Sequence, residues 1–108
     1  GALAEYEKLM TGNERDAVLK NNRGVARLKT NRLVEAEADF KEAAKLKKDM
    51  AEAHFNLAII YAYRGFTDKC MEALDQAVAI DSNMKCKIFS NPVFKTLKKD
   101  PKFAKYKC

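Results

Sequence analysis

The chain repeats its own pattern every 34 residues, and this repetition limits what it can fold into more than any other feature. When the sequence is shifted by 34 positions, Ala17–Met50 falls on Ala51–Met84. Small residues then meet small residues, and large apolar residues meet large apolar residues. A period of this length is typical of stacked units that each bury an apolar face against the next. The matching pairs include Gly24 with Ala58, Asn31 with Gly65, Ala36 with Cys70, Phe40 with Leu74, and Ala43 with Ala77.

Each unit is predicted to contain two helices. In residues 51–84, apolar residues recur at helical spacing up to Tyr61, and Gly65 is expected to end the first helix. Asp68 stands where a second helix can begin. Residues 17–50 repeat this arrangement around a turn near Thr30 and Asn31. The alanines on these helices let paired helices approach closely.

This pattern resembles the tetratricopeptide repeat family. The family carries an aromatic residue, Leu-Gly and Tyr in the first helix, and Ala, an aromatic residue and Ala in the second. The matching positions are Leu57, Ala58, Tyr61, Gly65 and Ala77 in one unit, and Gly24, Ala36, Phe40 and Ala43 in the other. The departures are His54, Cys70, Leu74, Lys20, Arg23 and Arg27, with Lys48 and Ser82 in place of a closing proline. The resemblance implies an all-α fold, a right-handed superhelix (α-α solenoid) of antiparallel helix pairs. It would hold about two and a half repeats plus a C-terminal cap.

We expect one domain over residues 1–108, with repeats at 17–50 and 51–84. Residues 2–10 are expected to form the second helix of a partial preceding repeat, or an N-terminal cap, with Ala2 and Tyr6 at its motif positions. Residues 85–108 break the repeat and predict a Lys-rich helical cap. Asn91-Pro92 and Asp100-Pro101 each predict a helix start, giving helices near 92–99 and 101–106. The apolar residues expected to face the last repeat are Val93, Phe94, Leu97, Phe103 and Tyr106.

The charge of the chain is concentrated at its C-terminal end. Residues 1–84 hold 13 Lys and Arg against 14 Asp and Glu, whereas residues 85–108 hold eight Lys against Asp100 alone. A nearly neutral body argues against nucleic acid as a partner, and no apolar run is long enough to span a membrane. The lysines are interpreted mainly as a solvated face. The alternative is an anionic polymer or membrane bound by the tail, which would require binding that weakens steeply with salt.

No catalytic, metal or cofactor site is expected. The sequence has a single histidine, His54, and three cysteines without a zinc-binding spacing. His54 is interpreted as a half-buried packing residue, Cys70 as a small core residue and Cys108 as an exposed thiol. An odd number of cysteines makes a disulfide framework unexpected. We therefore predict that the domain is not an enzyme and needs no cofactor.

The family resemblance implies a binding groove on the concave face, lined by the first helix of each pair. The predicted peptide-binding residues are Asn22, Val25, Lys29, Phe55, Asn56, Ile59 and Tyr63. Asn22 and Asn56 would bond the main chain of a ligand, and Phe55, Ile59 and Tyr63 would fill pockets. Family members that clamp the carboxylate end of chaperones use Lys and Asn where this chain has Asn21 and Val25, so that specialisation is not expected.

Two functions therefore stay open from the sequence. The first is an adaptor or scaffold that binds a protein or peptide partner in the groove. The second is a structural element that docks through its stack ends to a parent chain or to a second copy. Gly1-Ala2 without an initiator Met suggests that the native N-terminus is missing. A signal peptide could then not be seen, so localisation stays open with the cytoplasm favoured.

Overall fold

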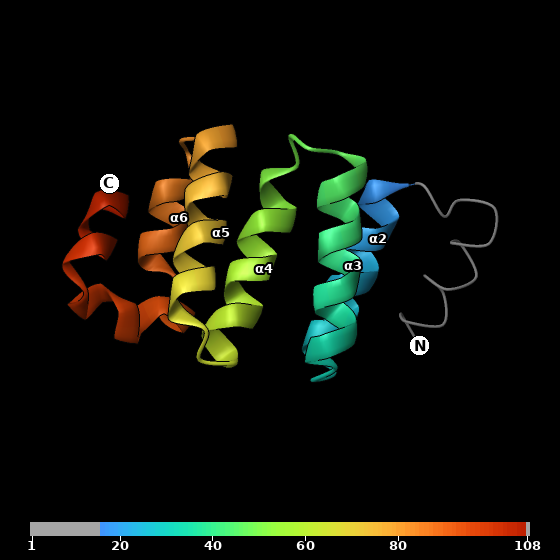
Figure 1. Cartoon of the computed structure of the whole chain (residues 1–108), viewed down its shortest axis with the longest axis horizontal. Helices are drawn as coiled ribbons and strands as arrows, with labels where there is room; N and C mark the ends of the chain where they lie inside the picture. Colours follow the sequence, from blue (N-terminus) through green and yellow to red (C-terminus); the bar gives the residue numbers. More distant parts are fainter. Residues whose placement is uncertain (1–15, 108) are drawn as a thin grey trace.

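The computed structural model describes residues 16–107, and within them it is helical with no strand. Four longer helices follow one another and are closed by three short ones: α2 (Ala17–Lys29), α3 (Leu33–Leu46), α4 (Ala51–Tyr63), α5 (Thr67–Ile80), α6 (Met84–Ser90), and the 3₁₀ helices η1 (Pro92–Lys99) and η2 (Pro101–Tyr106). Figure 1 shows them side by side in chain order, with the cap at the far end from α2. The fold is the tetratricopeptide-like helical repeat that the sequence predicts. The helix expected at residues 2–10 lies outside the described residues.

In each of the two long helix pairs, the first helix is joined to the second by the same kind of turn. In the turn between α4 and α5, Gly65 adopts φ 78°. The N–H of Phe66 donates to the carbonyl of Tyr61 at 2.8 Å, and the N–H of Gly65 donates to that of Ala62 at 3.2 Å. This pair of bonds is the Schellman motif that ends many helices. Asn31, one repeat earlier, adopts φ 62° in the equivalent position, so both turns depend on a residue that tolerates the left-handed region.

The close contact between α2 and α3 depends on Gly24. A Cβ placed on this glycine would lie only 2.5 Å from Cε1 of Phe40, whose side chain is fully buried. Ordinary contacts between carbon atoms are about 3.5–4.0 Å. The absence of a side chain on α2 therefore makes room for a phenylalanine ring on α3. The small residue at this position lets the two helices approach closely.

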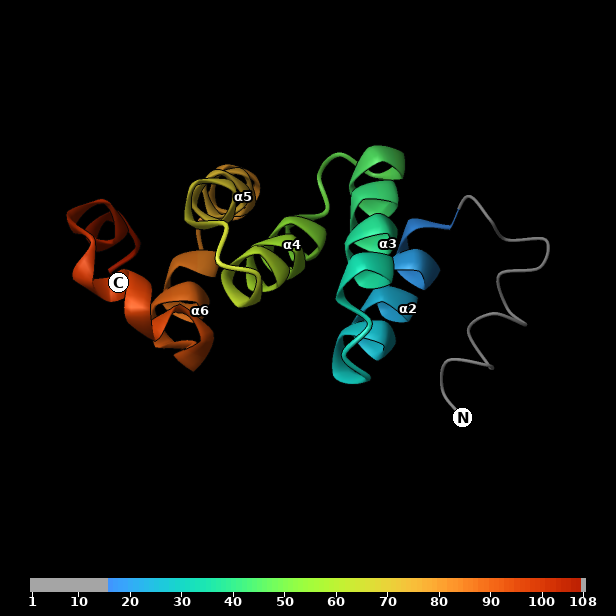
Figure 2. The same cartoon turned by 60° about the horizontal axis from the view of Figure 1, so that its bottom comes forward.

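The C-terminal cap belongs to the same core as the helix pairs. The fully buried rings of Phe94, Phe103 and Tyr106 pack in one apolar cluster with residues of α3, α4 and α5. As predicted, the cap helices start at Asn-Pro and Asp-Pro: Asn91 accepts from the N–H of Val93, and Asp100 accepts from that of Lys102. Figure 2 shows the cap continuing the row of helices beyond α6. The cap therefore closes the apolar end of the stack.

An ionic cluster joins α2 to α3 where family-pattern residues are missing. Asp39 is 3% exposed. Its carboxylate accepts from Arg23 Nη2 at 2.7 Å and from Arg27 Nη1 at 3.0 Å. Buried carboxylates are found with such charged donors because an isolated one is costly to desolvate. The arginines that depart from the family pattern thus hold a buried acid.

Within residues 16–107, no helix has the length and apolar character needed to cross a bilayer.

Candidate functional site

An apolar cavity lies where α2, α4 and η1 meet, and it is the candidate site. Its volume is about 650 Å³, and its apolar lining residues include Leu28 of α2, Ile59 of α4 and Val93 of η1. Tyr63 lines it with a side chain that is 60% exposed. An exposed aromatic residue beside an apolar hollow is typical of a surface that contacts another protein. The remaining lining residues are Lys29, Asn31 and Leu33.

The predicted binding residues divide into three groups in the structure. Lys29, Ile59 and Tyr63 line the cavity together. Asn22 and Val25 lie half-buried on α2, before the cavity begins. Phe55 and Asn56 are buried in α4, with only 4% and 7% of their surface exposed. The structure therefore brings part of the predicted set to one open surface and encloses another part in the interior.

The placement of Phe55 does not fit the expected role of filling a ligand pocket. Its ring contacts the ring of Phe94 edge to face, with centroids 6.0 Å apart. The ammonium group of Lys87 lies over the face of the Phe55 ring, 5.4 Å from its centroid. The cap thus covers α4 where an open groove was expected, and Phe55 becomes part of the joint between repeat and cap.

Asn56 is also engaged within the chain. Its Nδ2 donates to Oδ1 of Asn21 at 3.2 Å, which links α4 to α2. A buried amide needs such a partner, because an unpaired one costs roughly 1–3 kcal/mol. The predicted contact of Asn56 with a ligand main chain would have to replace or share this bond. Asn56 therefore serves first to hold the two groove helices together.

Val93 is the lining residue that reasoning from the repeat missed. It was expected only to pack on the last repeat, and it is half-buried, but it also forms a wall of the cavity. The repeat frame places groove residues on the first helix of each pair and says nothing of a cap. The sequence signal that could have indicated Val93 is its position directly after Asn91-Pro92, at the exposed start of a short helix.

The hollow at the opposite end of the same helices is lined by three acids and one lysine. This hollow, of about 630 Å³, lies at the start of α2 and α4, with Val18, Asn21 and Ala51 among its lining residues. Its charged residues are Lys47, Asp49, Glu52 and Asp81. The groove surface is therefore acidic where α2 and α4 begin. Where they end, the charged residue lining the cavity is Lys29.

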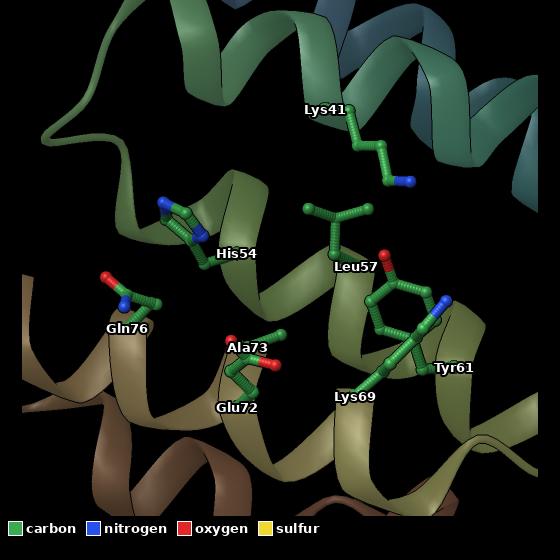
Figure 3. Close-up of a pocket in the computed structure, with 8 residues that line it drawn as sticks. All are labelled: Lys41, His54, Leu57, Tyr61, Lys69, Glu72, Ala73 and Gln76. Carbon is green, nitrogen blue, oxygen red and sulfur yellow. The ribbon is translucent and has the colours of Figure 1, made fainter.

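A further pocket lies on the other side of α4, between α3 and α5. It has a volume of about 300 Å³, and its apolar lining residues include Leu57 and Ala73. Figure 3 shows the amino groups of Lys41 and Lys69 at the Tyr61 end of this pocket. The charges here are largely balanced, since Glu37 pairs with Lys41 at 3.1 Å and Glu72 also lines the pocket. The hydrogen bond that Lys41 donates to Glu37 raises the pKa of Lys41, with Tyr61 adding to the effect.

His54, at the far end of this pocket in Figure 3, behaves as the half-buried residue that was predicted. Burial lowers its pKa, so its imidazole is neutral at pH 7. No cluster of three or more metal-binding side chains occurs in the described part of the chain. Nothing in this pocket joins a nucleophile to a base.

The cysteines differ from expectation at one position. Cys70 is a free thiol in the core, and burial raises its pKa to about 12, so it is held as an unreactive apolar residue. Cys86 is disulfide-bonded. The odd number of cysteines made a disulfide framework unexpected, and the bond at Cys86 corrects that expectation for this residue. The reason is that sequence spacing carries no information on which sulfur atoms the fold brings together.

Comparison with known families decides the nature of the second helix pair. Residues 51–84, which contain α4 and α5, match the family model described as the tetratricopeptide repeat. The α4–α5 unit is a tetratricopeptide repeat. Tetratricopeptide repeats are in general protein–protein interaction modules and are typically not catalytic. The search of curated proteins finds no match to the chain.

Proposed function

We propose that this domain is a non-catalytic adaptor that binds a segment of a partner protein on the face formed by α2, α4 and η1. The observation that carries the proposal is the apolar cavity of about 650 Å³ beside Tyr63, a ring left 60% exposed. A folded chain that exposes such a ring next to an apolar hollow gains free energy when a partner covers both.

The binding would combine apolar contacts with a few polar ones. Ile59 and Val93 offer the walls for an apolar side chain, and the Tyr63 ring can pack on it while its hydroxyl reaches the edge. Asn22 and Val25 continue the same helix face from Lys29 toward the start of α2, so a segment longer than the cavity would meet them next. The 13 residues of α2 span about 20 Å, and an extended segment spans about 3.3 Å per residue, so roughly six residues would run the length of this helix.

Buried residues of the predicted set would act indirectly. Asn56 fixes the spacing of α2 and α4 through its bond to Asn21, and Phe55 supports the cap that carries Val93. Rigid support of this kind keeps a binding surface in one shape and lowers the entropy lost on binding. We therefore place the binding energy on Ile59, Tyr63 and Val93, and the positioning on Phe55 and Asn56.

The experiment is selection of the domain against a displayed library of random 12-residue peptides, followed by affinity measurement on the enriched peptides. Tyr63→Ala is expected to lower affinity at least tenfold, since truncation of a central aromatic contact costs about 2 kcal/mol. The exposed position of Tyr63 means that its loss leaves the fold intact.

The matched control is Val34→Ala, an apolar truncation on α3 at a residue that is 68% exposed and outside the cavity. It should bind like the wild type. Failure to enrich any peptide, or enriched peptides bound equally by Tyr63→Ala, would contradict the proposal. In that case the competing proposal, docking through the stack ends, predicts a solution mass that rises with protein concentration.

A further inference from the structure

Most of the cap lysines pair with no acid of residues 16–107. Lys87 pairs with Glu52 and Lys105 with Asp75, each at 2.7 Å. For the other cap lysines, no ion pair occurs with any residue of the range 16–107. These are Lys85, Lys95, Lys98, Lys99, Lys102 and Lys107. The one acid of this segment, Asp100, uses its carboxylate to cap the N–H of Lys102.

The geometry of the cap helices gathers these charges. In a 3₁₀ helix, residues three apart lie directly above one another. The buried row of η1 is Phe94 and Leu97, so Lys95 and Lys98 form the adjacent exposed row. Lys99 extends the charge at the end of η1. Because the buried rings fix the helix, the charges are presented on a defined surface rather than on a mobile tail.

This basic surface adjoins the candidate groove. Val93, which lines the cavity, lies on the same 3₁₀ row as Lys99, which is about 12 Å farther along the helix axis. Lys95 stands about 4 Å along that axis on the neighbouring exposed row. Lys29 lines the cavity from α2, and Arg32 follows in the exposed turn after it. The acids of nearby α3 are already engaged, Glu35 with Arg27 and Glu37 with Arg64. The helix ends of α2 and α4 contribute only partial negative charge here, about half a unit each.

We infer that the partner segment carries acidic residues next to its apolar residues, and that the acidic part lies on Lys95, Lys98 and Lys99 of the cap. This inference rests on the proposed groove function. The apolar part would fill the cavity at Tyr63 and Val93, and about four acidic residues, or roughly 13 Å of extended chain, would cover the lysine row. The acidic lining at the opposite end of the groove, Asp49 and Asp81, would repel the same residues and so sets the direction in which the segment lies.

Carboxylates fit this surface better than a nucleic acid or a membrane does. All the cations of residues 85–108 are lysines, whereas arginine is the residue that recognises phosphate by paired hydrogen bonds. The large apolar side chains exposed in the described chain are Val18, Val34, Leu46, Tyr63 and Phe66, all outside the cap. The cap therefore lacks, within residues 84–107, an exposed ring for base stacking or for insertion into lipid.

The test compares charge-reversed variants on the peptides selected from the random library. The variant Lys95→Glu/Lys99→Glu removes the surface, and Lys45→Glu/Lys48→Glu is the control with the same change of net charge on exposed residues of α3 and its following turn. We expect enriched peptides to hold acidic residues on one side of an apolar group. The cap variant should bind them about fivefold more weakly and the control should not, and the affinity of the wild type should fall with added salt.

Each other outcome has a separate meaning. Peptides that enrich and depend on Tyr63, but show no acidic bias or no loss with the cap variant, would overturn this inference and leave the groove function standing. Absence of any Tyr63-dependent peptide would overturn both. Vesicles of phosphatidylserine and phosphatidylcholine, and single-stranded oligothymidine, serve as further probes. If either probe binds the wild type more tightly than the selected peptides do, and Lys95→Glu/Lys99→Glu weakens that binding, the inference is overturned in favour of that class of partner.

Discussion

The contact between Gly24 and Phe40 permits a severe test of how this fold is packed. An alanine at Gly24 would place its Cβ 2.5, 2.8 and 2.9 Å from three atoms of the Phe40 ring. Contacts between carbon atoms have their optimum near 3.5–4.0 Å, so the ring or the helix would have to move by about 1 Å. Phe40 is fully buried, and its ring has no exposed side into which it can turn.

The expected loss follows from two opposed terms. Alanine in place of glycine in a helix interior gains about 1 kcal/mol. Overpacking of a filled core typically costs about 1–3 kcal/mol, and a 2.5 Å approach belongs at the upper end. The free energy of unfolding of Gly24→Ala should therefore fall by about 2 kcal/mol. At about 4–8 °C per kcal/mol for a chain of this size, the melting temperature should drop by roughly 8–16 °C.

The second repeat supplies the control. There the corresponding residues are Ala58 and Leu74, a larger residue on the first helix and a smaller one on the second. The double variant Gly24→Ala/Phe40→Leu copies this pair. Chemical denaturation of the wild type, both single variants and the double variant should show a favourable interaction of about 2 kcal/mol. A Gly24→Ala protein as stable as the wild type would refute the reasoning, because the contact would then be relieved at no cost.

Two further predictions concern buried and partly buried charges. Asp39→Ala should lower the free energy of unfolding by about 3 kcal/mol, because it leaves two arginines of α2 without their shared carboxylate. Truncation of the exposed Glu42 should cost less than about 0.5 kcal/mol in the same denaturation assay, and equal losses would contradict this account. Burial acts to raise the pKa of Asp75, but hydrogen bonds from Lys105 and Tyr106 outweigh it and hold the pKa below its ordinary value. A depressed pKa stabilises the fold above the unfolded value near 3.8 and loses that effect as pH falls through the folded value. The stability difference between wild type and Asp75→Asn should therefore shrink from pH 7 to pH 2, and a constant difference would argue against the assignment.

Much of the candidate site could be predicted because it depends on the repeat frame. The spacing that places Ile59 and Tyr63 on one helix face follows from 3.6 residues per turn, and Lys29 falls in line with Tyr63 one repeat earlier. The burial of Phe55 could not be predicted in this way. Its surroundings depend on how the cap turns back over α4, which is a contact between segments about 39 residues apart.

The sequence by itself determined the helices, their turns and the starts of the cap helices. These are decided over a few residues, by apolar spacing, by Gly65 and Asn31 in left-handed positions, and by Asn and Asp before proline. Only the tertiary structure decided which sides of those helices stay open. The bond from Asn56 to Asn21, the ionic cluster at Asp39 and the wall at Val93 each join segments that no local preference connects. The physical reason is that burial and pairing depend on which surfaces meet, and that outcome belongs to the packed chain as a whole.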